Sequence, residues 1–532
     1  MPLLERPTPT LISGADDRFL SSAGTARPQK TVILLYTLLA LATTAYLFLF
    51  LRILTTTIDQ GTYLYGAQMV AQGAVPFRDF PEVSTGGELY WVALFFKLFG
   101  TSFLAARIAL GITGVATVLA AFHLARRIGG TGIFAALFVA VTSIPLMIMN
   151  SPHYESNLFA LLALAVFLRG ESCGGRWTLF LAGVIAGVAS CFLQQKGFYI
   201  TASFVLSILI LHRTERLKRI GMVLGGYLTV AALGAAFYGV EGVLPHFIRF
   251  NLRLAKEYHN LNAAPYGWEL WAQWIPVWFE IARKLMPAPA AFATSLALNL
   301  PYVLIAALPL LIGALLWFWK KELWRREIVP YWAAGYGIWL AEMHRHDITH
   351  LRNGSILLAI LFLTLCEKHK SAWPRACVLV LGGCLVLNGI VGAGLALQYK
   401  TPIHSRHGTL LARHPDGALQ FLLAHTKSGD YIFVYPYRPV YYFLADARNP
   451  IPFSALVYHA NNAAEFRQAV RDLQTKKVKY VLWDAVFSGN GMRIVFPAYR
   501  QPPPNQLIME PYLESHYRQV AYANGFRILE RK

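Results

Sequence analysis

The chain of 532 residues is 56% hydrophobic and 14% aromatic, and only 14% of its residues are charged. Soluble domains carry about 25% charged residues, and several apolar runs approach the roughly 20 residues that cross a bilayer, so this composition indicates a membrane protein. The net charge of +20 does not indicate nucleic-acid binding, because the cations are spread over short loops rather than gathered on one basic face. The five cysteines lie in or beside apolar segments, so no disulfide framework is expected in the hydrophilic tail.

The N-terminal part of the chain predicts an anchor followed by a structured external loop. Residues 1–29 are polar and are expected to form a cytoplasmic tail. The apolar run 31–53 is not followed by a small-residue cleavage site, so we expect it to remain as the first membrane span. The next stretch predicts a short amphipathic helix over 60–71 and a membrane-grazing helix over 87–100, which is too short to cross.

Ten further apolar runs follow, and the loops between them differ in charge. The first two are expected at about 104–125 and 131–149, and the last at about 376–397. Lys and Arg gather in alternate loops, at Arg126–Arg127, Arg213–Arg219, Lys320–Arg326 and Lys368–Arg375. Because such clusters mark cytoplasmic loops, the alternation predicts about eleven crossings, with the N-terminus inside and the C-terminus outside. The transmembrane region is expected to cover 30–399.

The tail, 400–532, predicts a small external α/β domain of ~130 residues, which is an ordinary domain size. The segments GDYIFVY (429–435) and KYVLWD (479–484) are typical of buried strands. Between them, Asn462 suits the N-cap of a helix over NNAAEFRQAVRDL, and RQVAYANGFRILER predicts an Asn-Gly hairpin. The tail carries no nucleophile elbow, phosphate loop or metal motif. We therefore expect a lid or acceptor-guiding module, or a domain that only stabilises the external face.

In this topology the unusual polar residues fall on the outer side. Asp59 follows the first span and is a candidate catalytic base, although it also suits the N-cap of the next helix. Glu155, in SPHYESN, is a second catalytic candidate, with a solvated residue beside a helix cap as the alternative. Lys196, in QQKG, suits a lipid phosphate, or a side chain that extends to the membrane interface. Asp79 and Glu82 are candidates for positioning the acceptor, or members of a solvated loop.

The segment HRHDITHLR (344–352) gathers charged and histidine residues between two short apolar runs, where such polarity is costly. These residues are His344, Arg345, His346, Asp347, His350 and Arg352. Arg345 and Arg352 suit a bidentate grip on a phosphate, and all of the set except His344 are phosphate-binding candidates. Histidines at i and i+4 without the Glu of a zinc-protease motif leave a divalent metal as an open alternative. A second alternative is that this segment is only a hydrated loop between two spans.

The residues after the first span also form a pattern. It reads Asp59–x3–Tyr63–x3–Ala67, then Gly73–x–x–Pro76–Phe77–x–Asp79, then Tyr90-Trp91 and Leu98-Phe99-Gly100, with Arg107 beyond. This pattern resembles the multi-spanning GT-C glycosyltransferases, which include the bacterial aminoarabinose (lipid A) transferases and the protein O-mannosyltransferases. These enzymes take sugars from polyprenyl-phosphate carriers. The resemblance implies an α-helical polytopic membrane protein of GT-C type with a small external α/β domain.

The resemblance also assigns site residues and shows departures from the family. It implies that Asp59 is the essential carboxylate of the first external loop, and that Glu155 is the acidic residue of the second. The run Arg345–Asp347–His350 looks like the Arg-x-Asp-x-x-His of a late external loop. Asp59–Gln60 stands where O-mannosyltransferases have Asp-Glu, and Thr85-Gly86-Gly87 stands where the lipid A type has Lys-Pro-Pro. Arg78 is expected to replace the missing lysine.

Together these observations predict a glycosyltransferase that moves a sugar from a polyprenyl-phosphate donor to a lipid, glycan or protein acceptor. The active site and tail domain are expected on the periplasmic or extracellular side of a bacterial inner membrane. The expected partners are the lipid-linked donor and membrane lipids, with no nucleic acid; a divalent metal is the one cofactor left open. Two alternatives remain: a flippase or transporter for lipid-linked sugars, which needs charged residues at mid-span, and a non-catalytic membrane scaffold, in which Asp59 is replaceable.

Overall fold

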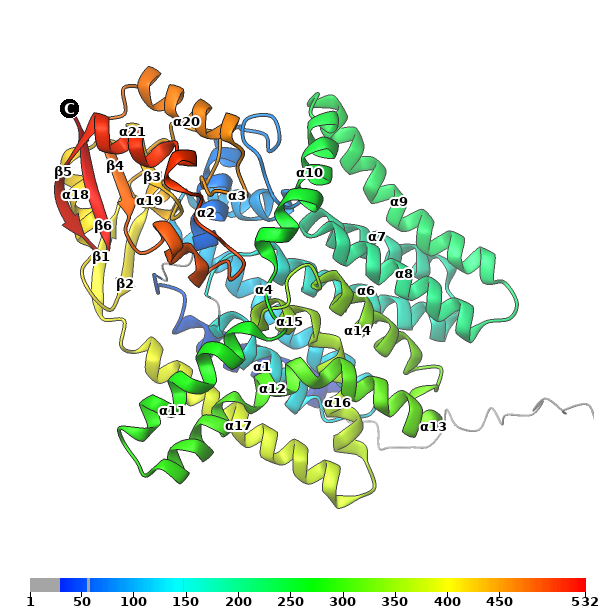
Figure 1. Cartoon of the computed structure of the whole chain (residues 1–532). Helices are drawn as coiled ribbons and strands as arrows, with labels where there is room; N and C mark the ends of the chain where they lie inside the picture. The colour runs from blue at the N-terminus through cyan, green and yellow to red at the C-terminus, as the bar shows by residue number, and fades with distance from the viewer. Residues whose placement is uncertain (1–28, 55–57, 147) are drawn as a thin grey trace, which may run out of the picture.

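The computed structural model describes residues 29–54, 58–146 and 148–532, as a helical body with a smaller α/β domain at one end (Figure 1). The expected cytoplasmic tail therefore lies almost wholly outside the described residues. The helices of the body are α1 Gln29–Phe48, α2 Ile58–Ala71, α3 Gly87–Phe99, α4 Phe103–Arg127, α5 Ile133–Thr142, α6 Pro152–Cys173, α7 Arg176–Phe192, α8 Gln194–Leu211, α9 Arg216–Val240, α10 Leu244–Asn262, α11 Ile275–Arg283, α12 Ala288–Phe318, α13 Lys320–Leu323, α14 Val329–Ala341, α15 Ile348–Gly354, α16 Ile356–Lys368 and α17 Ala372–Ala396.

Within the described residues, seven helices are long and apolar enough to cross a membrane; α15 and α16, bent by 65°, form either a broken eighth span or a re-entrant loop. Three further helices stand where spans are expected but are shorter: α5 has 10 residues, α14 has 13 and α7 has 17. Each of the eleven apolar runs thus becomes one helix or the bent pair. The hydropathy pattern located the helices, while the count of eleven crossings stays a prediction.

The loops that carry the basic clusters meet at the end of the body away from the α/β domain. The carboxylate of Glu171, in the last turn of α6, accepts a hydrogen bond from Arg219 at 3.0 Å and lies 2.5 Å from the His212 ring. At the same end, the Lys368 ammonium donates to the Ile128 carbonyl at 2.6 Å. Loops far apart in the sequence therefore share one side, as the alternation of basic loops predicts.

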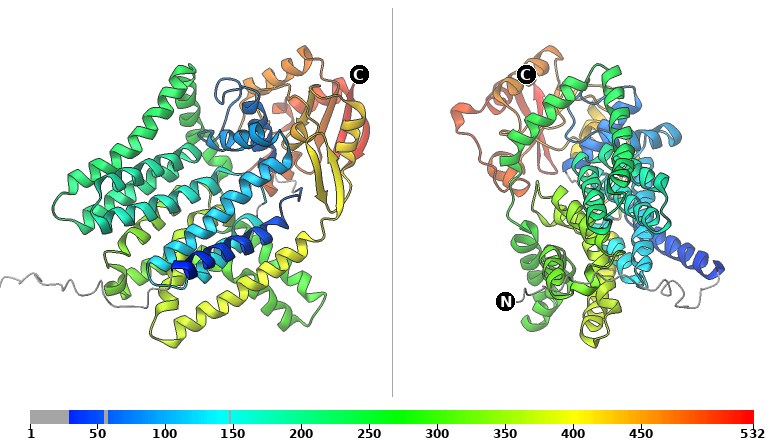
Figure 2. Two further views of the ribbon diagram at one scale, coloured as in Figure 1. Left: turned by 180° about the vertical axis from the view of Figure 1, so that it is seen from behind. Right: turned by 90° about the vertical axis from the view of Figure 1, so that its right-hand side faces the viewer.

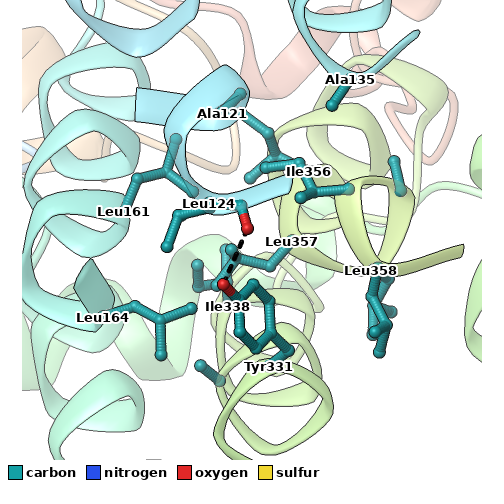
Figure 3. Packing of buried hydrophobic residues seen from close by; sticks show 14 of the residues in the cluster. Ala121, Leu124, Ala135, Leu161, Leu164, Tyr331, Ile338, Ile356, Leu357 and Leu358 are labelled. Carbon is teal, nitrogen blue, oxygen red and sulfur yellow. Dashed lines mark hydrogen bonds between the residues drawn. The ribbon is translucent and has the colours of Figure 1, made fainter. Parts of the chain in front are cut away.

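The centre of the body is a continuous apolar core built from α4, α6, α14 and α16. Figure 3 shows it around the buried Tyr331, whose hydroxyl donates to the Leu124 carbonyl at 2.9 Å. The leucines and isoleucines around this bond come from different helices and include Leu161, Leu164, Ile338 and Leu357. Since a buried hydroxyl without a partner is costly, this bond fixes α14 against α4. The core thereby sets the positions of the helix ends that carry the polar residues described below.

The C-terminal domain follows α17 directly (Figure 2) and contains a hairpin and a mixed sheet. Its elements are β1 Thr401–Ser405, β2 Gly408–Ala412, α18 Gly417–His425, β3 Ile432–Tyr435, α19 Val440–Leu444, α20 Ala463–Thr475, β4 Tyr480–Asp484, α21 Met509–His516, β5 Tyr517–Ala523 and β6 Phe526–Arg531. The sheet order is β3-β4-β6-β5, with β3 and β4 parallel and the other pairs antiparallel.

The local predictions for this tail are confirmed. Both predicted strands form, with every residue of β3 and β4 buried. The helix between them begins with a capping box, in which Asn462 and Glu465 each accept hydrogen bonds from the other's backbone region. The hairpin turns at Asn524 and Gly525, which have φ of 51° and 79°, the left-handed conformation that such a turn requires. The β1–β2 hairpin was not predicted.

The inner face of the sheet shares one hydrophobic core with the external loop helices. Ile432 and Leu482 of the sheet belong to the same buried cluster as Leu64 of α2 and Phe96 of α3. The other face packs instead against α20 and α21. The C-terminal domain is therefore fixed to the helix that carries Asp59, and its position bears on that residue directly.

We expect Gly61→Ala to separate the C-terminal domain from α2. A Cβ at Gly61 would lie 1.9 Å from the backbone nitrogen of Val440 at the start of α19, so the chains must move apart. Overpacking of this kind costs about 1–3 kcal/mol, and the melting temperature should fall in thermal unfolding of the detergent-solubilised protein. The matched control is Gly234→Ala in α9, where nothing lies within 4 Å. Equal melting temperatures for the two variants would contradict the close contact.

Candidate active site

The central feature of the site is a fully buried ion pair between Lys196 and Glu342. The Lys196 ammonium, in the first turn of α8, lies 2.5 Å from the carboxylate of Glu342, which follows α14. It also donates to the Asn157 side-chain oxygen of α6 at 2.8 Å. Both charged side chains are 0% exposed. The alternative that Lys196 extends to the membrane interface is therefore wrong.

Two histidines from different segments adjoin this ion pair. The Nδ1 atom of His153, near the start of α6, lies 2.9 Å from the Glu342 carboxylate. The rings of His153 and His350 meet edge to face, with centroids 5.1 Å apart. The His344 ring stands the same distance, 5.1 Å, from that of His350. Of these residues the sequence singled out His344 and His350 but not His153, and it missed Glu342, for which a lone carboxylate at the end of an apolar run was the available signal.

Arg352 extends the network toward α5. Its guanidinium donates to the carbonyls of Thr142 at 3.2 Å and Ser143 at 2.9 Å, and to the Tyr154 hydroxyl at 3.3 Å. The side chain is buried, and within the described part of the chain no carboxylate lies within 4.0 Å of it. A buried cation held by neutral oxygens keeps its charge available to an anion.

Arg345 has a different environment from the one expected. Its guanidinium binds the Asp347 carboxylate, the Asn262 side chain at 2.8 Å and the Val495 carbonyl of the C-terminal domain at 2.6 Å. Asp347 caps α15 by accepting from the backbone of His350 at 2.9 Å. Although burial opposes ionisation, the neighbouring His350 and Arg345 hold the pKa of Asp347 well below its usual range. Arg345 therefore joins the loop to the C-terminal domain.

A buried pair of acidic residues lies beside the network. Glu155, in the first turn of α6, accepts from the Thr113 hydroxyl at 2.8 Å, and it is 1% exposed. The alternative of a solvated Glu155 is therefore wrong. Glu88, at the start of α3, is also fully buried, and burial first and the charge of Glu155 second raise its pKa well above the usual range. The sequence reasoning missed Glu88, although it is the one carboxylate in its apolar run.

Asp59 lies in the first turn of α2, beneath the C-terminal domain. Its carboxylate accepts a hydrogen bond from the Tyr437 hydroxyl, which belongs to that domain. Burial raises the pKa of Glu82, and the negative charge of Asp59 is among the further causes. Glu82 is itself held by the backbone N–H groups of Val83 at 2.8 Å and Ser84 at 3.1 Å. Asp59 and Glu82 thus form one acidic group at the edge of the domain interface.

Two of the predicted phosphate-binding residues lie apart from the network. Arg78 binds its neighbour Asp79 at 2.9 Å and Glu241 at 2.8 Å on the exposed surface. The His346 carbonyl accepts from the Gly267 N–H at 2.7 Å, and its ring stands beside Tyr266 rather than with the other histidines. Their roles in phosphate binding stay predictions.

The Thr85-Gly86-Gly87 run is explained by close packing against α7. The Thr85 hydroxyl donates to the Cys191 carbonyl at 2.6 Å. A Cβ at Gly87 would lie 2.2 Å from the same carbonyl oxygen, so only glycine fits there. A bulky Lys-Pro-Pro run has no room in this place. The close contact with α7 therefore explains why the sequence departs here from the lipid A type.

A cavity of about 350 Å³ lies between α2 and the C-terminal domain. Its walls include Tyr65 of α2, Asp79 and Glu82 of the following loop, and Asn449 and Lys476 of the domain. Both residues predicted to position an acceptor thus line one cavity. A pocket of this size with several polar walls suits a small polar ligand.

Glu269 gives the site a pH-dependent contribution to stability. Burial first and the charge of Asp347 second raise its pKa to about 7, while its carboxylate accepts from the Ile348 N–H at 3.1 Å. Because its pKa is higher in the folded state than the unfolded value of about 4.3, its favourable contribution is complete below that value. As pH rises from that unfolded value toward the folded pKa of about 7, this contribution is lost at up to about 1.4 kcal/mol per pH unit, and above the folded pKa the loss levels off.

The expected result is a melting temperature that falls between about pH 5 and pH 8. Glu269→Gln keeps the oxygen that accepts from Ile348 and removes the charge, so it should flatten that slope. The exposed Glu280 provides the control, as Glu280→Gln should leave the slope unchanged. A Glu269→Gln profile parallel to that of the wild type would contradict the assignment.

Comparisons with known proteins bear on this arrangement. Residues 88–238 match the family described as dolichyl-phosphate-mannose-protein mannosyltransferase. ArnT from Cupriavidus metallidurans, bound to undecaprenyl phosphate, is 13% identical and aligns with a TM-score of 0.56 over 94% of this chain and 98% of that chain. Its apo structure is 11% identical, with a TM-score of 0.53 and the same coverage of 94% and 98%. No curated protein sequence matches significantly.

A third solved structure is the archaeal oligosaccharyltransferase AglB from Archaeoglobus fulgidus, in complex with an inhibitory peptide and a dolichol-phosphate. It is 14% identical and aligns with a TM-score of 0.47 over 92% of this chain and 73% of that chain. The likeness to ArnT confirms the GT-C fold predicted from the sequence. Together with the apolar helices, it identifies a multi-pass membrane protein. The family match and the fold both point to a membrane glycosyltransferase.

Proposed function

We propose that this protein transfers a sugar from a polyprenyl-phosphate donor to an acceptor at the end of the helical body that carries the C-terminal domain. This end faces the periplasm or cell exterior of a bacterial inner membrane. The observation that carries the proposal is the pair of buried cations, Lys196 and Arg352, in a fold like that of an undecaprenyl-phosphate-bound transferase. A buried cation is costly without a counter-ion: Lys196 has Glu342, whereas Arg352 is held by neutral oxygens and can take an anion.

The two buried cations are proposed to stabilise the leaving group, the lipid phosphate. In the transfer, the bond between the anomeric carbon and the phosphate oxygen breaks, and its electron pair stays with the lipid phosphate. Lys196 and Arg352 would stabilise the charge that develops on this oxygen, in a site from which water is excluded. Arg352 is already held by the carbonyls of Thr142 and Ser143, so little reorganisation is needed when the phosphate arrives.

Asp59 is proposed to activate the nucleophile, the attacking group of the acceptor. As the acceptor oxygen or nitrogen attacks the anomeric carbon, its proton must be removed, and a positioned carboxylate takes it. Tyr437 holds the Asp59 carboxylate from the C-terminal domain side, so acceptor binding beneath that domain would place the attacking group next to the base. The cavity lined by Asp79 and Glu82 is the proposed entry for the acceptor.

The Glu88–Glu155 pair is assigned to the sugar. Two buried carboxyl groups this close cannot both be ionised, so one of them keeps a proton. The pair then offers both a hydrogen-bond donor and an acceptor, which suits sugar hydroxyl groups. The ionisable residues Glu88, Glu155 and Lys196 each lie in the first turn of their helix, α3, α6 and α8. That placement favours a transferase over a transporter, which needs charges at mid-span.

The test is a transfer assay with the purified protein in lipid vesicles. A panel of polyprenyl-phosphate sugars is offered on the side of the C-terminal domain, together with lipid, glycan and peptide acceptors, and labelled sugar is followed into product. Mass spectrometry of co-purifying lipids selects the panel. Transfer from at least one donor supports the proposal. Movement of the labelled donor to the other leaflet without transfer would establish a transporter instead. If the protein shows neither transfer nor transport, the scaffold alternative is supported.

A further inference from the structure

We infer that His153, Glu342 and His350 form a binding site for a divalent transition metal, with Zn²⁺ the best match. One ligand atom from each of these residues lies within 4.8 Å of the other two. The residues come from α6, the end of α14 and α15, so the site ties together three separate segments. The inference does not depend on the transferase activity proposed above, since metal binding is measured directly.

The donor set selects the kind of metal. Two imidazoles and one carboxylate make a His₂Glu set, which is a common zinc combination that leaves one of the four positions open. Ligand atoms bound to one zinc ion at about 2.0–2.1 Å stand roughly 3.3 Å apart in a tetrahedron. The His153 Nδ1 and Glu342 carboxylate oxygen are 2.9 Å apart, so a small outward movement admits the ion. Mg²⁺ and Ca²⁺ prefer oxygen ligands and fit this set poorly.

A second carboxylate orients the His350 ring toward the site. The His350 Nδ1 lies 2.7 Å from the Asp347 carboxylate, which leaves Nε2 as the atom for a metal. Asp347 is in turn held by the Thr349 hydroxyl at 2.7 Å and by Arg345. Metal-binding histidines almost always donate their other ring N–H to such a carboxylate, which fixes the tautomer and the ring plane.

Glu342 has an oxygen that the protein does not satisfy. Its Oε1 serves both Lys196 and His153, whereas its Oε2 is buried and has no hydrogen-bond donor within the described part of the chain. A buried carboxylate oxygen without a partner is costly. A metal ion held between this oxygen and the two histidines supplies the missing partner.

Lys196 and the metal compete for Glu342. The ammonium occupies the carboxylate at 2.5 Å, and a cation beside it would be repelled. Metal binding therefore turns Lys196 away from Glu342 while Asn157 still accepts from it at 2.8 Å. The freed ammonium becomes available to an anion, so the metal would switch Lys196 from a structural to a ligand-binding role.

The first experiment measures stoichiometry in the full-length protein without a histidine tag. The detergent-solubilised protein is stripped with a chelator, dialysed against Zn²⁺ and analysed for metal. We expect one equivalent in the wild type, at least a tenfold weaker affinity in a His153→Gln/His350→Gln variant, and wild-type binding in His246→Gln, which removes an exposed histidine outside the site. With Co²⁺ in place of Zn²⁺, the absorption bands of tetrahedral cobalt should appear in the wild type and be absent from the double histidine variant. Equal binding by wild type and double variant would overturn the inference.

The second experiment uses the competition with Lys196. In Lys196→Met, Zn²⁺ should bind at least tenfold more tightly than in the wild type and should raise the melting temperature, because the ion replaces the lost charge. If this variant is unstable in chelator, zinc should restore it. A melting temperature that zinc leaves unchanged would overturn the inference, as would failure to recover a folded variant in zinc.

Discussion

Asp59→Asn is expected to lower the rate of sugar transfer by about 10²–10⁴-fold, the usual contribution of a general base. Asparagine keeps the size of the side chain and can still accept the hydrogen bond from Tyr437, so the fold should be preserved. Asparagine cannot take the acceptor proton, so the attacking group must react while it is still protonated. Binding of the polyprenyl phosphate should be almost unchanged, because the phosphate is held by Lys196 and Arg352 and not by Asp59.

The measurement is the initial rate of transfer in vesicles, with the donor affinity determined separately by displacement of a labelled polyprenyl phosphate. Glu280→Gln is the matched control, because that carboxylate is exposed and lies outside the buried network. Tyr437→Phe removes the hydroxyl that positions Asp59 and should give an intermediate loss in rate. A wild-type rate for Asp59→Asn would remove the assigned base and favour the scaffold alternative.

Much of the fold follows from local signals in the sequence. The hydropathy pattern located each apolar helix, and the basic loops predicted which helix ends share a side. In the tail, the Asn462–Glu465 capping box and the Asn524-Gly525 turn act through backbone geometry within a few residues. Such signals do not depend on distant parts of the chain, which is why they are readable without a structure.

The site was only partly predictable, because its decisive contacts join distant segments. Lys196 and Glu155 were candidates from the sequence, yet only their burial shows that neither is a solvated residue at a helix end. Their neighbours Glu342 and Glu88 carry no motif, and each is defined by a partner far along the chain. The contact of Tyr437 with Asp59 requires the packing of the tail domain on α2, which periodicity alone does not specify.

Lys196→Met, studied with a chelator present, is expected to lower the stability of the protein by about 3–5 kcal/mol, because it leaves the Glu342 charge buried and unpaired. Glu342→Gln should have a similar effect, since it leaves the ammonium without its counter-ion. The double variant removes both charges together and should recover most of the melting temperature. A double-mutant cycle on thermal unfolding measures this coupling, and additive losses would contradict a direct ion pair between the two groups.

The same double variant separates the structural role of Lys196 from its proposed role in binding. If the lysine only balances Glu342, then restoring stability in Lys196→Met/Glu342→Gln should also restore donor affinity and transfer. If Lys196 holds the lipid phosphate, the double variant should melt near the wild type yet bind polyprenyl phosphate at least tenfold more weakly, because a charge-assisted contact is worth about 1.5–3 kcal/mol. Glu342→Gln alone then becomes informative: its lysine is released from the carboxylate, so donor affinity should be retained or increased even as stability falls. Loss of donor affinity in that single variant would place the phosphate elsewhere.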